Sequence, residues 1–391
     1  MAKGNTISYF DLLRARGAKA NLLLGMVGRL PVSTAGVAIL VAVSASSGSP
    51  FFSGVATAVY VLVSSIAAPF WSHRMDVLGQ QGILKFVGFL QGFMWFALAL
   101  ACTVSASYFL LIACCIILGA LSLDIGSVVR VRWKLALVNE DKFITALFIE
   151  STVDEVMFAL SPILVTLAAT VSPTIAPAVV GLGPIVGWTG LGMHKHGMQM
   201  IAIARTSQRK WNWGNLPWLF MLIFLTIGCL LGSIEVLLVN NAMKIENPIS
   251  AGLALAAWAS GSSAVALLLG PKLAIYDQRI ILLVGLIVMT SFTSLLVIAN
   301  SSLLTLIICF IAGTGAAPTF SAGFALVSIV SKDGQLTENL SWLTSCMGVG
   351  TTIGIFAAST ATIYFHLSSE FFVPVVFGIV ATLITSVAIS R

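Results

Sequence analysis

The stretch from His194 to Asn215, HKHGMQMIAIARTSQRKWNWGN, is the longest polar interruption in a chain of 391 residues. Long apolar runs lie on both sides of it. The whole sequence is 58% hydrophobic and only 9% charged, with a mean hydropathy of +1.04. A soluble domain carries about a quarter charged residues, so this composition excludes an ordinary soluble protein and indicates an integral membrane protein.

The apolar runs on either side of the interruption are counted as membrane spans. A helix needs about 20 apolar residues to cross roughly 30 Å of hydrocarbon. Six runs of that length precede the interruption and six follow it, at Asn21 to Val43, Phe51 to Phe70, Ile83 to Ala101, Tyr108 to Val129, Phe143 to Val171, Ile175 to Met193, Leu216 to Val239, Ala251 to Gly270, Ile280 to Ala299, Leu303 to Val330, Leu340 to Phe365 and Phe371 to Ile389.

The basic residues test this count, because cytoplasmic loops collect Lys and Arg. With both termini in the cytoplasm, all of the twenty basic residues except Arg29 and Lys244 fall on or near the cytoplasmic side. One missed span would move every later loop to the other side. The pattern therefore predicts an even number of spans and cytoplasmic termini in the cytoplasmic (plasma) membrane. The net charge of +6 follows from this topology and implies no nucleic-acid partner.

The interruption also predicts the domain organisation. We expect an all-α integral membrane protein with twelve transmembrane helices in two six-helix bundles. The predicted boundaries are 1–193 for the first half, 194–214 for a cytoplasmic linker and 215–391 for the second half. Many transporters are built from such repeated halves.

A weak internal echo supports two related halves. APFWSHRMD ends the second span and places Pro69 seven residues before Asp76. GPKLAIYD ends the eighth span and places Gly270 seven residues before Asp277.

Charged residues inside the spans are the first candidates for function, because an ionisable group at the bilayer centre costs at least about 2.5–3.5 kcal/mol. Most of them lie in ALFIESTVDEVMFALSPIL, from Ala146 to Leu164. Away from the span edges, the buried charges are Arg29, Asp124, Glu150, Asp154, Glu155 and Glu235.

Depth estimates bring Arg29 and the acids of span five together. At 1.5 Å per residue, Arg29 lies roughly 12 Å from the cytoplasmic end of its span, Glu150 about 10 Å and Asp154 with Glu155 roughly 17–18 Å. Glu150 and Asp154 share a helix face, whereas Glu155 is rotated by about 100°. Only one residue of the adjacent pair Asp154 and Glu155 is therefore expected to face Arg29.

Two interpretations of this group stay open. Arg29 and one acid could form a static ion pair that fixes the helix register. Alternatively, three acids against one nearby base leave surplus negative charge, so that one acid exchanges protons in a substrate or proton pathway. Asp124, near the cytoplasmic end of span four, and Glu235, near the outer end of span seven, are added to this predicted pathway.

No cofactor or metal is expected from the sequence. The six cysteines lie in or beside apolar runs without metal-ligand spacing, and the histidines stand at span ends. No phosphate loop of the form GxxxxGK[ST] occurs, which argues against an ATP-driven pump. The motifs HExxH and GxSxG are also absent, so the sequence does not indicate an enzyme.

Twelve spans in two sixes, a basic central linker and an acidic turn after spans two and eight resemble the major facilitator superfamily of secondary transporters. The signature of that family after span two is a Gly, an Asp four residues later, then Arg, Gly and a basic pair. Here SHRMDVLGQQ matches it at Asp76 and Gly79, while Ser72, Val77, and Gln80 with Gln81 replace the other positions.

The stretches VVRVRWKLAL, ESTVDEVMFALSPIL, GSIEVLLVNNA, APTFSAGFALVSIV and LTENLSWL resemble a branch of the superfamily common in actinobacteria. The resemblance implies a gate in which Asp76 and Gly79 act and Asp76 pairs with a helix end or a cytoplasmic Arg, with Arg130 and Arg132 as candidates. A structural role of Asp76 as a turn acid or helix cap is the alternative. The Gly-Pro motif of drug–proton antiporters is replaced by Ser161-Pro162, which does not favour a drug exporter.

The function predicted from all of this is secondary active transport of a small solute by alternating access, coupled to protons through an exchanging acid. The alternative is a membrane sensor or scaffold that retains the fold without transport. The expected partners are the substrate and the lipid bilayer, and the chain is expected to be a monomer.

Overall fold

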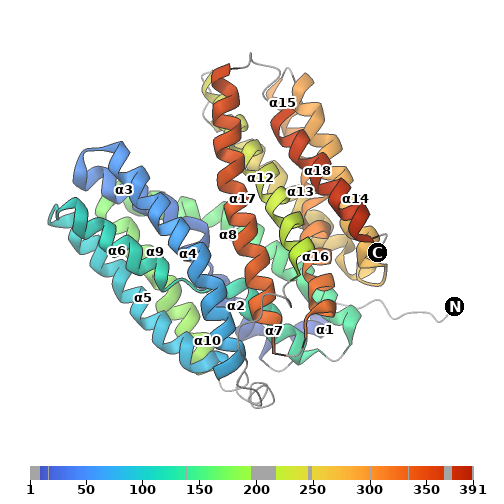
Figure 1. Ribbon diagram of the computed structural model, residues 1–391, viewed down its shortest axis with the longest axis horizontal. Coiled ribbons are helices and arrows are strands. Elements are labelled where there is room, and N and C mark those ends of the chain that lie inside the picture. The colour runs from blue at the N-terminus through green and yellow to red at the C-terminus, as the bar shows by residue number, and fades with distance from the viewer. Residues whose placement is uncertain are drawn as a thin grey trace.

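The computed structural model describes residues 9–15, 17–137, 139–194, 217–244, 249–299, 301–332, 334–364 and 372–389. Nearly all of them are helical (Figure 1). Eleven helical segments are long and apolar enough to cross a membrane, and the shorter apolar helix Phe372–Ala388 supplies the twelfth. The predicted twelve-span, multi-pass membrane fold is confirmed. Most of the predicted linker 194–214 lies outside the described residues, as does most of the basic stretch that defined it.

The first bundle contains the spans that precede the linker, and a short helix α1 (Tyr9–Leu13) comes before it. Its helices are α2 (Ala18–Gly28), α3 (Leu30–Ser47), α4 (Pro50–Leu78), α5 (Gln80–Thr103), α6 (Tyr108–Ala120), α7 (Ile125–Ala136), α8 (Glu140–Val171), α9 (Ala176–Leu182) and α10 (Thr189–Met193), with a 3-10 turn at Pro173–Ile175 and a π-helical turn at Gly183–Trp188.

The second bundle contains the spans that follow the linker. Its helices are α12 (Trp218–Lys244), α13 (Ile249–Leu273), α14 (Gln278–Ser294), α15 (Ser302–Gly313), α16 (Ala316–Val330), α17 (Leu336–Tyr364) and α18 (Phe372–Ile389), and a 3-10 turn at Leu295–Ile298 extends α14.

Two spans expected to be continuous are broken in the first bundle. Span one divides into α2 and α3 at Arg29, because Pro31 has no N–H for the preceding turn and its ring crowds the carbonyl of Val27. The indole Nε1 of Trp188 donates to the carbonyl of Gly28 over 2.8 Å, which satisfies an acceptor at the break. Span four divides into α6 and α7, and Asp124 caps α7 by accepting from the Ser127 N–H.

Within the second bundle, the helices α12 and α17 pack with their backbones in direct contact. A Cβ added at Gly350 would lie 2.0 Å from the carbonyl oxygen of Leu225, and one at Gly354 would lie 2.0 Å from that of Cys229. Gly228 and Gly232 of α12 meet the backbone of α17 equally closely. Small residues permit such close helix contacts in membranes, where packing rather than the hydrophobic effect drives association.

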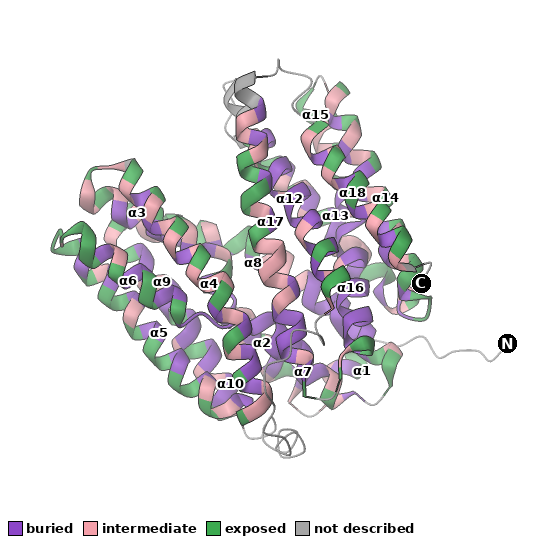
Figure 2. Cartoon of the chain, viewed as in Figure 1, coloured by how far each residue is buried: buried purple, intermediate pink, exposed green. Residues whose placement is uncertain are grey.

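The two bundles meet at one end and diverge toward the other, as Figure 1 shows for α3 and α17. Figure 2 shows exposed residues along the outer faces of helices such as α5 and α14. Exposed large apolar side chains of these helices include Phe86 and Phe93 of α5 and Ile287 of α14. A lipid-facing surface requires such residues, because hydrocarbon solvates them as well as a protein core does.

Candidate functional site

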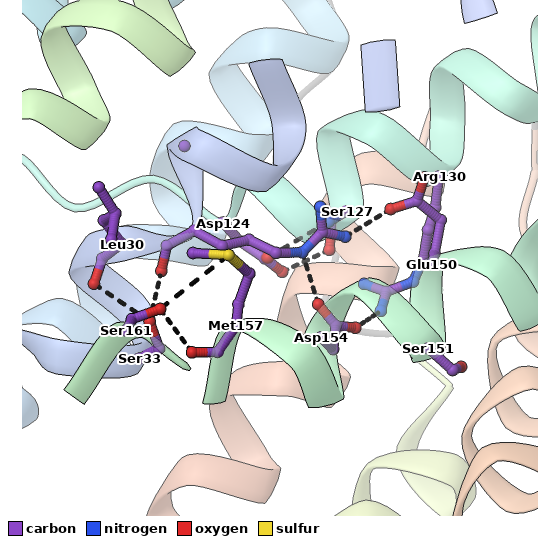
Figure 3. A network of polar contacts seen from close by, with 12 residues as sticks. Leu30, Ser33, Asp124, Ser127, Arg130, Glu150, Ser151, Asp154, Met157 and Ser161 are labelled. Atoms are coloured by element: carbon purple, nitrogen blue, oxygen red, sulfur yellow. Dashed lines mark hydrogen bonds and ion pairs between the residues drawn. The ribbon is translucent and has the colours of Figure 1, made fainter. Parts of the chain in front are cut away.

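Four charged side chains and one indole form a connected network inside the first bundle. Figure 3 shows Arg130, Glu150 and Asp154 of this network. Arg29 donates from Nε to Oδ1 of Asp154 over 2.5 Å and from Nη2 to Oε2 of Glu150 over 2.6 Å. Arg130 donates from Nη2 to the other carboxylate oxygen of Asp154 over 2.5 Å. The indole of Trp133 donates to Oε1 of Glu150 over 2.6 Å. Asp154 therefore bridges two arginines.

Local structure explains why these residues meet. Arg29 lies at the break between α2 and α3, so the site is built where span one is interrupted. Glu150 and Asp154 are four residues apart on α8, and Arg130 and Trp133 are three apart on α7, so each pair shares one helix face. Broken helices line the sites of many transporters.

The two acids of the network differ in exposure. The side chain of Glu150 is 0% exposed, whereas that of Asp154 is 29% exposed. Both arginine side chains are almost fully buried, at 5% for Arg29 and 3% for Arg130. Glu150 is thus enclosed by its two donors, and Asp154 is the charged group of the network that remains open to its surroundings.

The structure adds a second base to the group expected around Arg29, while Glu155 also interacts electrostatically with Asp154. Arg130, assigned to the gate from the sequence, joins the network, so two guanidinium groups face two carboxylates. The guanidinium carbon of Arg130 also lies 3.9 Å from the ring centroid of Phe324 in α16, a cation–π contact with the second bundle. Buried charges of opposite sign in equal number avoid the large cost of an uncompensated ion.

The three other predicted pathway acids lie outside the network. Of the adjacent pair, Asp154 faces Arg29, while Glu155 lies near the Ser262 hydroxyl of α13. Asp124 accepts from Ser127 within α7 and from the Thr344 hydroxyl of α17 over 2.6 Å. Glu235 is exposed on α12, away from the described network.

A second group of polar contacts joins the two bundles where they meet. Asp76, on the last turn of α4, accepts from the backbone N–H of Glu338 at the start of α17 over 3.0 Å. The same Glu338 lies 2.8 Å from Nδ1 of His73. An aspartate at a helix N-terminus is stabilised by the helix dipole and by unpaired N–H groups. Asp76 therefore contacts a helix end, one of the two pairings expected from the sequence.

Gly79 ends α4 with a φ of 87°, a backbone conformation that favours glycine, and lets α5 start immediately afterwards. The two arginines expected near Asp76 lie elsewhere in this conformation. Arg130 belongs to the charge network, and Arg132 donates to Gln80 over 3.0 Å and to the carbonyl of Leu191 over 3.1 Å, both within the first bundle.

Further contacts between the bundles reach toward the charge network. The hydroxyl groups of Ser151 on α8 and Ser321 on α16 are 3.0 Å apart, and the Tyr9 hydroxyl of α1 donates to the carbonyl of Ala266 on α13. The interface at this end also contains apolar packing, because one buried hydrophobic cluster includes Phe148 of α8 and Phe324 of α16.

The sequence pattern does not identify several residues of these contacts as functional candidates. Trp133, Glu338 and Ser151 lie inside the stretches VRWKLAL, LTENLSWL and ESTVDEV that were singled out, but a Trp, a helix-start Glu and a Ser carry no recognisable spacing. His73 was noted only as a histidine at a span end. Among the described residues, no group of three or more His, Cys, Asp or Glu side chains could hold a metal ion.

Comparisons with known proteins agree with the twelve-helix arrangement. Residues 236–391 match the family model of the Major Facilitator Superfamily. A comparison with curated proteins gives no match. Among solved structures, the human organic anion transporter TETRAN aligns with a TM-score of 0.70 at 14% identity, covering 95% of this chain and 99% of that one.

Two further solved structures show the same likeness. A bacterial homologue of the iron transporter ferroportin, in an outward-facing state, aligns with a TM-score of 0.73 at 14% identity over 95% of this chain and 99% of that one. The proton:xylose symporter XylE aligns with a TM-score of 0.62 at 11% identity over 96% and 95%. The chain has the fold of these transporters, and its second half matches the superfamily's model over residues 236–391.

Proposed function

We propose that this protein is a secondary active transporter that moves a small solute across the cytoplasmic membrane by alternating access, with proton coupling. The observation that carries the proposal is the combination of a buried charge network at a helix break with two bundles whose described helices meet at one end and diverge toward the other. Ionisable groups are rare at such depth and commonly mark substrate or ion pathways.

Polar contacts between the bundles support the alternating-access part of the proposal. Contacts such as Asp76 to the start of α17 and Ser151 to Ser321 hold one end closed. When such hydrogen bonds separate, water can replace each partner. This is the interface expected of a gate, and we assign Asp76, His73 and Glu338 to it.

The membrane orientation is part of the same proposal. The basic residues favour cytoplasmic termini, which makes the closed end cytoplasmic and the diverging end external. A single cysteine at Ser47→Cys, at the end of α3, should then react with an impermeant thiol reagent added to intact cells. The resemblance to a branch common in actinobacteria stays a prediction.

Proton coupling is assigned to Asp154. It is the exposed acid of the network, and its two arginine partners leave a cationic site whenever it takes up a proton. Glu150, fully enclosed by Arg29 and Trp133, suits the static ion pair that the sequence also allowed. Both interpretations of the acids therefore apply, each to a different residue.

The test is transport by purified protein in liposomes that contain a pH-sensitive dye, with a panel of solutes added outside. A solute that changes the internal pH only in protein-containing vesicles identifies transport and coupling together. The pair Ser151→Cys and Ser321→Cys should form a disulfide across the closed end, since the two oxygens are 3.0 Å apart. Oxidation should stop transport and a reductant should restore it.

Each single cysteine variant is the control for the disulfide pair and should transport in both redox states. Undiminished transport by the oxidised pair, with the disulfide verified, would exclude alternating access through this interface. A folded protein that moves no solute and changes no internal pH would favour the sensor or scaffold alternative.

A further inference from the structure

The chemical class of the substrate can be inferred from the donors that the charge network leaves unused. This inference rests on the proposed function, because it concerns the same site. The three solved relatives are described as transporters or homologues of transporters of organic anions, iron and xylose, so the fold alone selects no substrate.

Arg29 and Arg130 each carry a buried N–H group with no acceptor among the described residues. The atoms are Nη1 of Arg29 and Nε of Arg130. Leaving a buried donor of a charged group without a partner is unfavourable, and such groups are normally satisfied. Two of them on adjacent guanidinium groups indicate a site with more donors than its own acceptors can use.

The geometry of Arg130 defines what would use these donors. The Nε and Nη2 groups of a guanidinium project side by side and match the two oxygens of a carboxylate or a phosphate. In Arg130 only Nη2 is occupied, by a single oxygen of Asp154. An oxyanion could accept hydrogen bonds from both donors. A cation would be repelled by the guanidinium group, and the hydroxyl groups of an uncharged sugar are weaker acceptors than a charged oxygen.

Charge balance links this anion to a proton. With Asp154 ionised, the two arginines are balanced by Asp154 and Glu150. When the carboxylate of Asp154 takes up a proton from water, an O–H bond forms and the network carries one unit of positive charge. One monovalent anion then restores neutrality, and it can take the guanidinium donors that Asp154 releases.

The charged and polar groups around Asp154 set the condition for this balance. On its own helix, Glu150 remains bound to Arg29 and Trp133. Glu155 lies near Ser262 of α13 and also interacts electrostatically with Asp154, so the balance applies while Glu155 is uncharged. On α7, Asp124 is held by Ser127 and by Thr344 of α17. From α16, the neighbour of Arg130 is the uncharged ring of Phe324.

We propose that Arg29 and Arg130 bind a small oxyanion, a carboxylate or phosphate-like solute, and that one proton on Asp154 accompanies it. For a monovalent anion this is electroneutral symport. While Asp154 is ionised, its carboxylate occupies the guanidinium donors that the anion needs. The proton and the anion therefore bind together, as in symport, and are not exchanged for each other.

The experiment uses the dye-loaded proteoliposomes with solutes sorted by charge. The anions are gluconate, succinate and sulfate, the uncharged solutes are glucose and mannitol, and the cations are choline and tetraethylammonium. We expect internal acidification with at least one anion and with none of the others. Gluconate or any other monovalent substrate should produce no membrane current.

Binding is measured separately as stabilisation of the purified protein against heat by the same solutes. Stabilisation of the wild type by the anion should be stronger at pH 5.5 than at pH 7.5, because binding needs a proton. Asp154→Asn is permanently uncharged, so it should be stabilised equally at both values and should no longer acidify vesicles. Arg130→Lys keeps the charge but loses the paired donors, and its anion affinity should fall by about tenfold or more.

Lys134→Gln is the matched control for Arg130→Lys. It removes a basic residue one helical turn further along α7, where Lys134 lies over the ring of Phe143 and contacts no member of the network. It should bind and transport as the wild type does. If Arg130→Lys does not fold, the pH dependence of anion binding by the wild type still tests the inference.

Two results would overturn the proposal in distinguishable ways. Acidification by a cation or an uncharged solute, with no binding or transport of any anion, would refute the substrate class and leave the proposed transport function intact. The absence of binding, acidification and current with every solute would count against both the substrate class and the proposed function.

Discussion

The two bundles differ in what fills their interiors. The first contains the charge network of Arg29, Arg130, Glu150 and Asp154 and has two spans broken at or beside charged residues. The second brings α12 and α17 together through glycines, with backbone atoms of one helix against the other. The first half therefore contains the charged residues of the proposed site. The second half contains the closely packed helix pair, and we expect the first half to move against it during transport.

Removing an anion from the first bundle should give the largest effect. Glu150→Gln leaves the two arginines with Asp154 alone, and breaking a buried ion pair on one side costs about 3–5 kcal/mol. We expect a clear loss of folded protein and of thermal stability, measured in detergent by size exclusion and melting temperature. Adding Arg29→Gln should restore part of the loss, because the stranded cation is removed.

Glu140→Gln is the control for this experiment, since Glu140 is an exposed residue in the first turn of the same helix. It should melt like the wild type. If Glu150→Gln is equally stable, the network is not the structural centre of the first bundle and the contrast between the halves is lost.

Adding one methyl group to the second bundle should give an intermediate effect. A Cβ at Gly350 would lie 2.0 Å from the carbonyl oxygen of Leu225, a backbone atom that cannot turn aside. Overpacking of this kind costs about 1–3 kcal/mol, so Gly350→Ala should lower the melting temperature. Gly348→Ala, two residues away on α17, meets nothing within 4 Å and should have little effect.

Equal stability of the Gly350→Ala and Gly348→Ala proteins would show that α12 and α17 separate easily. The second bundle would then be as adaptable as the first, and the proposed division between a chemical half and a packed half would fail.

The smallest change in free energy is expected at the interface between the halves. Asp76→Asn removes a charge from the N-terminus of α17, which is worth about 0.3–1 kcal/mol. The closed end should open about two to five times more often. A cysteine at Ser341→Cys, buried at this end, should react faster with a thiol reagent by that factor once the reactivity of the native cysteines is subtracted.

Asp277→Asn tests the same chemistry within one half. Asp277 follows the echoed turn of the second bundle but caps its own helix, accepting from the Arg279 N–H over 2.9 Å. Its neutralisation should leave the labelling of Ser341→Cys unchanged. Equal acceleration by both variants would mean that Asp76 acts through general helix stability and not through the contact between the bundles.

Some features of the site were predictable from the sequence and others were not. Matched depth placed Arg29 with the acids of span five, and the helical period predicted that only one of Asp154 and Glu155 faces it. The resemblance made Arg130 a candidate partner of Asp76, whereas the structure places it in the charge network. The break before α7 redirects that helix and brings Arg130 and Trp133 to Glu150 and Asp154.

The sequence by itself determined the number of spans, their limits within several residues and their division into two sixes. These follow from local properties, because each segment of about 20 apolar residues must satisfy its backbone hydrogen bonds as a helix wherever it lies. Tertiary structure alone decided that Arg130 joins Arg29 at the two acids, that Glu150 is enclosed while Asp154 stays open, and that Asp76 meets the start of α17. Those contacts join helices from distant parts of the chain, so they depend on helix breaks and on the docking of the bundles, which no local pattern records.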